Sequence, residues 1–283
     1  MNTVNFFGKQ VTKLIIGDNP MSGHSYIEDT TPGSEMVAYY TAEHIKEALF
    51  RAEACGYNTM LPLADPYMIR LLQEYRRDGG KMQFIFQPYM AMDQNVSIRQ
   101  MATVEPIGIY HQGTTTDYLY ETDQCDQILA RIEQYRALGC PVGLGTHRPD
   151  VIEKCEREGW NVDFYLACMH NARRNREREQ SGFITGKTKS HLIFYPEDRP
   201  IMLETLQRTT TKPVIAFKIF GGGQMFLNKT QEEKRQLIKD AYQQVFSALK
   251  PNDFGAIGVF QRDSDQLAEN AELYNQWYQE RNK

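Results

Sequence analysis

Short apolar runs alternate with longer segments of helical period along the chain, and this pattern predicts an α/β protein with a parallel sheet. The runs are rich in Ile, Val, Phe and Tyr, and eight of them can be counted. Eight parallel strands close into a barrel, and 283 residues suit one such domain, since barrels of this class typically have about 250 residues. The sequence therefore predicts a single (β/α)8 barrel, or TIM barrel, over residues 1–283.

Each expected strand is short and is bounded by polar, Gly or Pro residues. The eight strands are expected at Lys13–Gly17, Thr59–Leu63, Gln83–Gln87, Ile107–His111, Pro141–Gly145, Asp163–Ala167, Pro213–Ile219 and Ala256–Phe260. Helices are expected between and after them, for example at Ala42–Cys55, Asp123–Leu138, Gln231–Leu249 and Ser264–Arg281. Before the first strand, Asn5–Phe7 and Val11–Ile15 flank a Gly8-Lys9 turn, which predicts a β-hairpin that could plug the amino-terminal end of the barrel.

Composition and charge narrow the class of protein. The net charge of −4 and the absence of a dominant basic block argue against a nucleic-acid partner and favour a small-molecule substrate. No stretch approaches the roughly 18 apolar residues of a membrane span, and the first residues lack the apolar part of a signal peptide, so we expect a cytoplasmic protein. Five cysteines without a CxxC pair argue against a disulfide framework and a structural zinc site. The oligomeric state is left open.

Active sites of such barrels lie at the carboxyl ends of the strands, so polar residues at those positions are the candidate site residues. They are Asp18, Asn19 and His24 after the first strand, Asp65 and Tyr67 after the second, Gln87 in the third, His111 and Gln112 after the fourth, Thr146 and His147 after the fifth, His170 and Asn171 after the sixth, Lys218 in the seventh, and Gln261 and Arg262 after the eighth. Four of the six histidines belong to this set, whereas His44 falls in a helix and His191 in a loop.

Two of these candidates carry the most specific expectations. His111 directly ends a strand in GIYHQG, where it could reach a substrate oxygen, although a strand-end histidine can instead bond a neighbouring loop. Lys218 lies within an apolar strand, and desolvation would lower its pKa and make it a nucleophilic amine or a donor to a substrate oxygen. The alternative for Lys218 is a buried salt bridge to Asp65 or Asp18, which would also place it near the mouth.

Two loops could bind an anion. Gly221, Gly222 and Gly223 follow the seventh strand, where barrels often hold phosphate, but a glycine run is also common in plain turns. The connection Ala172–Arg199, like Asp18–Thr41, is too long for a bare turn, and its Arg and Lys residues indicate either a basic lid or a solvated loop. Its Gly-Lys-Thr lacks the spacing and the strand-to-helix context of a nucleotide-binding P-loop.

Taken in order, several motifs resemble those of the aldo-keto reductase superfamily over essentially the whole chain. They are KLIIGDNPMSG, HIKEALFRAEACGYNTM, IYHQGTTTDY, the passage from ILARIEQY to FYLACMHN, PVIAFKIFGGGQM and GVFQRDSDQLAENAELY. That family reduces carbonyls with NADPH by means of an Asp, a Tyr, a Lys and a His. The resemblance implies that His111 is the His, that Tyr67 donates the proton and that Asp65 is a displaced counterpart of the Asp.

The same resemblance assigns the remaining candidates. Gln87 stands at the position of the family's Lys, so the charge that lowers the tyrosine pKa is missing. The implied cofactor-binding residues are Gly221, Gly222, Gly223, Arg262, His147 and Asn171, and the implied substrate-binding residues are Asp18, Asn19, His24 and Gln112. Asp263 and Asp265 in the last loop would oppose a cofactor phosphate.

Three functions stay open at this point. The first is an NADP-dependent oxidoreductase of a small carbonyl or sugar-type substrate. The second is a lyase, isomerase or hydrolase at the same mouth, either with a divalent metal held by His111, His147, His170 and Asp65 or with a Schiff base at Lys218. The third is a non-catalytic barrel that binds a sugar.

Overall fold

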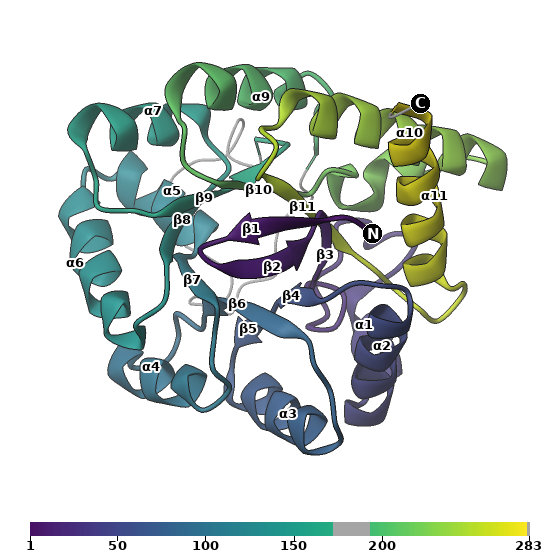
Figure 1. Cartoon of the computed structure of the whole chain (residues 1–283), viewed down its shortest axis with the longest axis horizontal. Coiled ribbons are helices and arrows are strands. Elements are labelled where there is room, and N and C mark those ends of the chain that lie inside the picture. Colours follow the sequence, from purple (N-terminus) through teal and green to yellow (C-terminus); the bar gives the residue numbers. More distant parts are fainter. Residues whose placement is uncertain (172–192, 282–283) are drawn as a thin grey trace.

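In the computed structural model, which describes residues 1–171 and 193–281, a closed parallel barrel forms the centre of the molecule (Figure 1). Its strands are β3 (Leu14–Gly17), β4 (Thr59–Leu61) with its continuation β5 (Leu63–Ala64), β6 (Gln83–Pro88), β7 (Gly108–His111), β8 (Val142–Thr146), β9 (Phe164–Cys168), β10 (Val214–Phe217) and β11 (Phe254–Gly258). The order is β4-β3-β11-β10-β9-β8-β7-β6, and pairing of β4 with β6 closes the ring. The predicted (β/α)8 barrel is confirmed.

Helices surround the barrel in Figure 1, as crossover connections between parallel strands require. They are α1 (Gly33–Tyr39), α2 (Ala42–Ala54), α3 (Pro66–Arg77), α4 (Gln94–Ala102), α5 (Gly113–Glu121), α6 (Cys125–Tyr135), α7 (Pro149–Glu158), α9 (Asp198–Thr209), α10 (Gln231–Ala248) and α11 (Gln266–Arg281), with short 3-10 helices at Arg136–Leu138 and Gly221–Phe226. Several begin at a side-chain cap: Thr41 accepts from the backbone N–H of His44, and Thr230 forms a capping box with Glu233. Within the described residues, no helix is both long and apolar enough to cross a bilayer.

Five strands differ from the sequence prediction by a single residue at one or both ends, and the larger differences are in the second, seventh and eighth strands. The second strand is interrupted at Pro62, which has no N–H for the sheet. The seventh strand ends at Phe217 rather than Ile219, because the next residue, Lys218, has a φ of 53° in the left-handed region. The eighth strand begins at Phe254, two residues earlier than expected, and ends at Gly258.

An antiparallel hairpin of β1 (Thr3–Phe6) and β2 (Lys9–Thr12) crosses one end of the barrel (Figure 1). The buried side chains of Val4, Phe6 and Val11 belong to the same apolar cluster as the inward residues of the barrel strands. The ring of Phe6 packs edge-on against Phe164 and Phe254, at centroid distances of 5.1 and 5.4 Å. The hairpin therefore plugs the amino-terminal end, as predicted.

Alternation along the strands separates the barrel interior from the layer between barrel and helices. In β7, Tyr110 belongs to the interior cluster, whereas Ile109 belongs to the outer cluster under the helices. His111 follows Tyr110 and has the same parity as Ile109, so its side chain lies on the outer side of the strand. Most of the connection Ala172–Arg199, the predicted basic lid, lies outside the described residues, which resume at Ile193.

Replacing Phe6 with alanine is expected to lower the free energy of unfolding by about 3–5 kcal/mol, because the change leaves a cavity between the plug and the barrel. Urea denaturation followed by circular dichroism measures the loss. Phe7→Ala is the matched control in the same hairpin. Its side chain is 49% exposed, so we expect a loss of about 1 kcal/mol or less. Equal losses in the two variants would contradict a plug that stabilises the barrel.

Candidate active site

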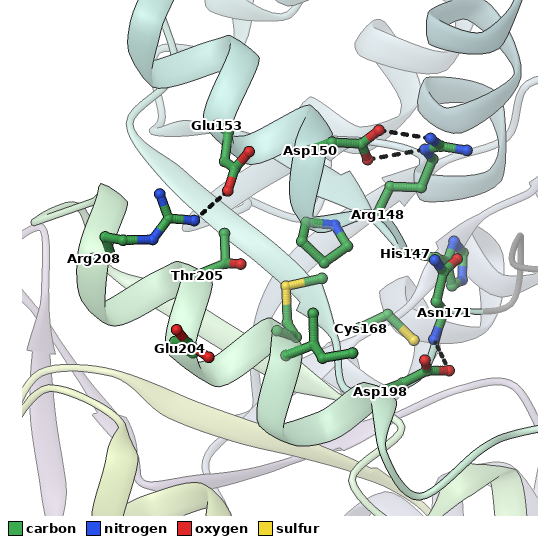
Figure 2. Close-up of a pocket in the computed structure, with 13 residues that line it drawn as sticks. His147, Arg148, Asp150, Glu153, Cys168, Asn171, Asp198, Glu204, Thr205 and Arg208 are labelled. Atoms are coloured by element: carbon green, nitrogen blue, oxygen red, sulfur yellow. Dashed lines mark hydrogen bonds and ion pairs between the residues drawn. The ribbon is translucent and has the colours of Figure 1, made fainter.

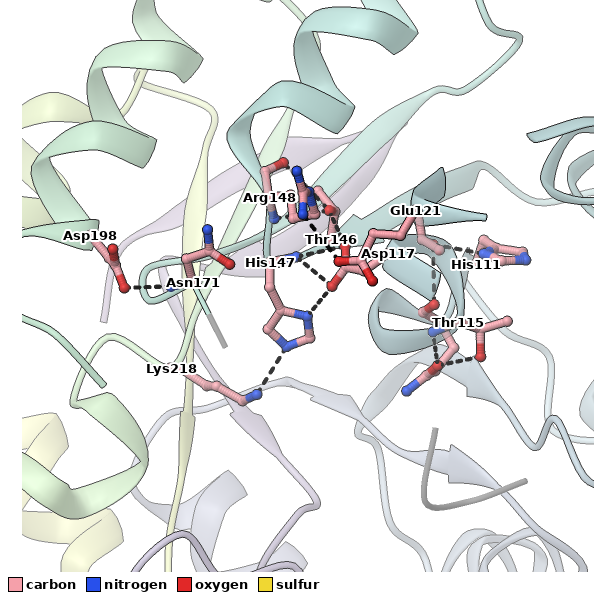
Figure 3. Close-up of polar contacts among 12 residues, drawn as sticks. His111, Thr115, Asp117, Glu121, Thr146, His147, Arg148, Asn171, Asp198 and Lys218 are labelled. Atoms are coloured by element: carbon pink, nitrogen blue, oxygen red, sulfur yellow. Dashed lines mark hydrogen bonds and ion pairs between the residues drawn. The ribbon is translucent and has the colours of Figure 1, made fainter. Parts of the chain in front are cut away.

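Three charged or ionisable side chains form a continuous chain of hydrogen bonds at the carboxyl end of the barrel (Figure 3). The Asp117 carboxylate lies 2.7 Å from Nδ1 of His147, and Nε2 of His147 lies 3.0 Å from Nζ of Lys218. Asp117 and His147 are buried, and Lys218 is partly buried. We call these three residues the relay.

Close backbone approach between β7 and β8 brings the relay together. Helix α5 starts directly after β7, with Gln112 as its cap, and it carries Asp117. A side chain at Gly145 would come within 2.9 Å of the carbonyl oxygen of His111, and one at Gly113 would press on the His147 ring at 3.3 Å. The motifs HQGTTTD and GLGTH thus place a helix carboxylate beside a strand-end histidine.

The contacts of Asp117 fix the protonation state of the His147 ring. The carboxylate also accepts hydrogen bonds from the Thr146 hydroxyl at 2.5 Å and from the backbone N–H of His147 at 3.3 Å. Because a carboxylate only accepts, Nδ1 of His147 carries the ring proton. Its Nε2 is then a lone pair that accepts a hydrogen bond from the ammonium of Lys218.

Aromatic rings surround the ammonium of Lys218. Its Nζ lies 4.6 Å from the centroid of the Tyr26 ring, 5.4 Å from that of Phe217 and 5.5 Å from that of Phe194. Rings at such distances stabilise a cation. This aromatic cage is built from three separate segments of the chain.

The expectation that desolvation lowers the pKa of Lys218 is wrong. Burial acts in that direction, but Tyr26, the Cys168 thiol and the Asp117 carboxylate outweigh it, so the pKa of Lys218 is raised above its ordinary value. The expected alternative, a salt bridge to Asp65 or Asp18, is not formed either. Asp65 caps helix α3 by accepting from the N–H of Met68, and Asp18 accepts from the N–H of Leu63.

The structure does not bring His111 into the relay. Its Nδ1 lies 2.7 Å from the Thr116 hydroxyl, and that hydroxyl donates to the carbonyl oxygen of Gln112, so Nδ1 is the donor to Thr116. The ring is buried, which lowers the pKa of His111 to about 3. In Figure 3, the side chain of Asp117 on α5 lies between His111 and Lys218. The placement of His111 at the mouth is therefore a wrong expectation.

Other candidates lie on or directly after β3 and β6 and on helix α3. The Tyr110 hydroxyl donates to Oε1 of Gln87 at 3.2 Å, so Gln87 is a hydrogen-bond acceptor for Tyr110. Tyr67 lies on α3, and 51% of its surface is exposed. Asp18 is buried at the end of β3, and burial raises its pKa to about 6. Asn19 donates to the Tyr26 hydroxyl at 3.2 Å and so helps to hold the ring of the aromatic cage.

The side chains of Tyr26 and Ile27 pack against the glycine loop after β10. A Cβ on Gly222 would come within 2.7 Å of the Tyr26 ring, and one on Gly223 would come within 3.5 Å of Ile27. The side chain of Gln224 ties this arrangement together by donating to the carbonyl oxygen of Tyr26 at 2.9 Å. The glycines thus allow Tyr26 to approach Lys218.

The last candidates make local contacts. Arg262 is exposed and pairs with Glu35 at 2.6 Å and with Asp263 at 2.8 Å, which occupies the charge that a cofactor phosphate would need. The backbone N–H of His24 donates to the carbonyl oxygen of Asn19 at 2.7 Å, and that of Asn171 donates to the Asp198 carboxylate at 2.8 Å.

The predicted metal ligands are not assembled. Among residues 1–171 and 193–281, no three His, Cys, Asp or Glu side chains lie close enough to hold one ion. His111 faces the helix layer and Asp65 caps a helix, so two of the four proposed ligands are engaged elsewhere. These donors do not fit a metal centre.

A cavity of about 450 Å³ lies between α7 and α9, beside the relay (Figure 2). His147, Cys168, Asn171 and Asp198 line its inner part. Figure 2 also shows two ion pairs in its wall, Arg148 with Asp150 and Arg208 with Glu153. His147 therefore lines this cavity and also contacts Lys218.

No protein-family model matches the sequence, and no curated protein matches it by sequence. Solved structures do match the fold. An aldo-keto reductase from Bacillus halodurans in its holo form is 12% identical, with a TM-score of 0.56 over 99% of this chain and 95% of that chain. The chain therefore shares the (β/α)8 barrel fold with this reductase.

Other barrels are about as similar. A truncated 3-deoxy-D-arabino-heptulosonate 7-phosphate synthase from Thermotoga maritima is 13% identical, with a TM-score of 0.53 over 99% of this chain and 91% of that chain. A phospho-2-dehydro-3-deoxyheptonate aldolase from the same organism is 14% identical, with a TM-score of 0.52 over 99% and 73% of the two chains. Such identities show the fold alone, so the function has to be argued from the site.

Stability is expected to depend on the titration of His111. Its pKa is about 3 in the folded protein against an ordinary 6.5, so the unfolded chain binds the extra proton between these values. The contribution is fully present above pH 6.5 and is lost as the pH falls. His111→Asn keeps a donor for Thr116 and removes the titration. In urea denaturation, the free energy of unfolding of wild type should therefore fall by about 2 kcal/mol more than that of the variant between pH 7 and pH 5. A constant difference would contradict a buried neutral His111.

Proposed function

We propose that the protein acts on a small carbonyl compound by forming an imine with Lys218, as a lyase or isomerase does. The observation that carries the proposal is the relay: a neutral imidazole nitrogen lies 3.0 Å from the lysine ammonium, and a carboxylate holds the opposite ring nitrogen at 2.7 Å. A lysine that served only as a fixed cation would be satisfied by a carboxylate. A histidine acceptor can instead take the proton away, which the nucleophilic form of lysine requires.

The relay residues can carry each proton of imine formation. His147 accepts a proton from the Lys218 ammonium, and the freed amine attacks the carbonyl carbon. A C–N bond forms while the π electrons move to the oxygen, which takes the proton from His147. His147 then removes a second proton from the nitrogen and passes it to the hydroxyl group. That group leaves as water as the nitrogen lone pair forms the C=N bond.

The aromatic cage suits both ends of this sequence. The ammonium and the carbonyl give a protonated imine and one water, so the lysine nitrogen is positively charged at the beginning and at the end, and His147 carries the charge in between. The rings of Tyr26, Phe194 and Phe217 that stabilise the ammonium would stabilise the iminium at the same position. Asp117 supports the intermediate states by stabilising His147 whenever its ring carries two protons.

The iminium would then withdraw electrons from the neighbouring carbon, which allows a C–H or C–C bond there to break. Such a step needs an acid–base group at the mouth. Asp18 lies at the carboxyl end of β3, and its pKa of about 6 lets it exchange protons near neutral pH. Lyase or isomerase chemistry would thus use Lys218 after β10 and Asp18 after β3.

NADP-dependent reduction is the second candidate, favoured by the fold likeness to the holo aldo-keto reductase. Its support within the site is weaker. Gln87 stands where the lysine of the resemblance belongs, and Tyr26 and Ile27 pack on Gly222 and Gly223 of the expected cofactor loop. Binding of NADPH, followed by fluorescence titration, would favour this candidate over the imine, provided that no carbonyl adduct forms at Lys218.

Borohydride reduction in the presence of acetone, hydroxyacetone, glyceraldehyde or pyruvate is expected to give a covalent adduct on Lys218, located by peptide mass mapping. Lys13 is the internal comparison. It is buried at the plugged end, its Nζ donates to the carbonyl oxygen of Pro251 at 2.9 Å, and burial lowers its pKa to about 8. A low pKa alone would direct the adduct to Lys13. Labelling of Lys13 or of exposed lysines without Lys218 would overturn the proposal.

Variants of the relay separate its members. His147→Gln is expected to slow adduct formation on Lys218 by ~10²–10⁴, the usual effect of losing a general acid–base group. Asp117→Asn should act in the same direction, because an amide can donate to Nδ1 and so move the ring proton to Nε2, where it faces Lys218. His111→Asn is the control, and its rate should stay close to that of wild type. Loss of the adduct in His111→Asn but not in His147→Gln would contradict the role of His147 as the base and would point to His111 instead.

A further inference from the structure

His170 is a second histidine at the mouth, and among residues 1–171 and 193–281 only one of its ring nitrogens has a hydrogen-bond partner. Its Nδ1 lies 3.2 Å from the carbonyl oxygen of Tyr195. A carbonyl oxygen only accepts, so Nδ1 carries the proton and Nε2 is a lone pair. Within the described part of the chain, Nε2 is buried and has no hydrogen-bond partner, and the residue is 4% exposed.

A buried acceptor without a partner is rare in folded proteins and calls for a specific explanation. The surroundings of His170 also keep the ring neutral. Burial and the positive charges of Arg199 and Lys218 lower the pKa of His170 to about 4. The ring therefore cannot gain a second proton at neutral pH, and Nε2 remains an acceptor that a ligand can satisfy.

His170 and Lys218 border the same aromatic side chain. The Phe194 ring lies 5.4 Å from the His170 ring, centroid to centroid, and 5.5 Å from Nζ of Lys218. Gly221 lies against Nε2, because a Cβ at that glycine would be 3.4 Å from it. Because Gly221 has no side chain, the space next to this nitrogen is not filled by one. The charge of Lys218 is close enough to affect His170.

We propose that Nε2 of His170 accepts a hydrogen bond from a hydroxyl group of the carbonyl substrate, so that the substrate is a hydroxylated, sugar-type carbonyl compound. This inference rests on the proposed imine at Lys218. A hydroxyl is the donor that fits, because an ammonium would be repelled by Lys218 and Arg199. A site built around a buried acceptor discriminates against analogues that lack the donor, since the acceptor is then left unpaired.

The test compares hydroxyacetone with acetone, which differ by one hydroxyl group, in borohydride trapping on Lys218. Hydroxyacetone is intrinsically more reactive, so the quantity of interest is the rate ratio of the two ketones in wild type divided by that ratio in a variant. His170→Phe removes the acceptor and is expected to lower the ratio about tenfold, which corresponds to the loss of one hydrogen bond. Acetone trapping should stay unchanged.

Two further variants control for misfolding and for general effects of losing a histidine. His170→Gln retains an acceptor oxygen and should restore part of the preference, a recovery that a purely structural role would not produce. His44→Gln is the matched control, because His44 also bonds a backbone carbonyl through Nδ1 and stacks on an aromatic ring, but it lies on α2 away from Lys218. Its ratio should equal that of wild type.

The outcomes separate the two proposals. Adducts on Lys218 with a ratio that is the same in wild type and His170→Phe would overturn the role of His170 and leave the imine intact. No adduct on Lys218 with either ketone would overturn the imine and this inference with it. A tenfold fall in His170→Phe with partial recovery in His170→Gln would support both.

Discussion

The positive charge of Lys218 is the constraint around which the mouth of this barrel is organised. A cation at the end of an apolar strand has to be stabilised by its surroundings, and here an imidazole and three aromatic rings do so. The imidazole is in turn oriented by a buried carboxylate from α5. The long connection after β3 and the segment at Phe194 each contribute a ring to the cage, and the loop after β10 leaves room for Tyr26.

The sequence predicted the barrel because its strands and helices have clear periods. It also selected Lys218 and His147, since a charged residue inside an apolar strand and a histidine at a strand end are local signals. Asp117 was missed, because it lies on a helix and only the close approach of β7 and β8 brings it to His147. No pattern near Asp117 in the sequence marks that contact.

The error at His111 has a physical reason of a different kind. Successive side chains of a strand point to opposite faces, and Tyr110 already occupies the interior of β7. His111 must therefore lie under the helices, where its single titration affects stability rather than chemistry. Tyr110 belongs to the same cluster as the hairpin side chains, and alternation counted from Tyr110 gives this orientation of His111. The end of β10 could not be predicted from the sequence either, because nothing in PVIAFKI indicates a left-handed backbone conformation at Lys218.

Tyr26 and Gly222 lie far apart in the sequence, yet the ring of one fills the space that a side chain on the other would take. Neither position can change alone during evolution. A larger residue at position 222 would push the ring away from Lys218, and a smaller residue at position 26 would leave the glycine loop uncovered. Related sequences should therefore show paired changes at these two positions, which would reveal the contact without any structure.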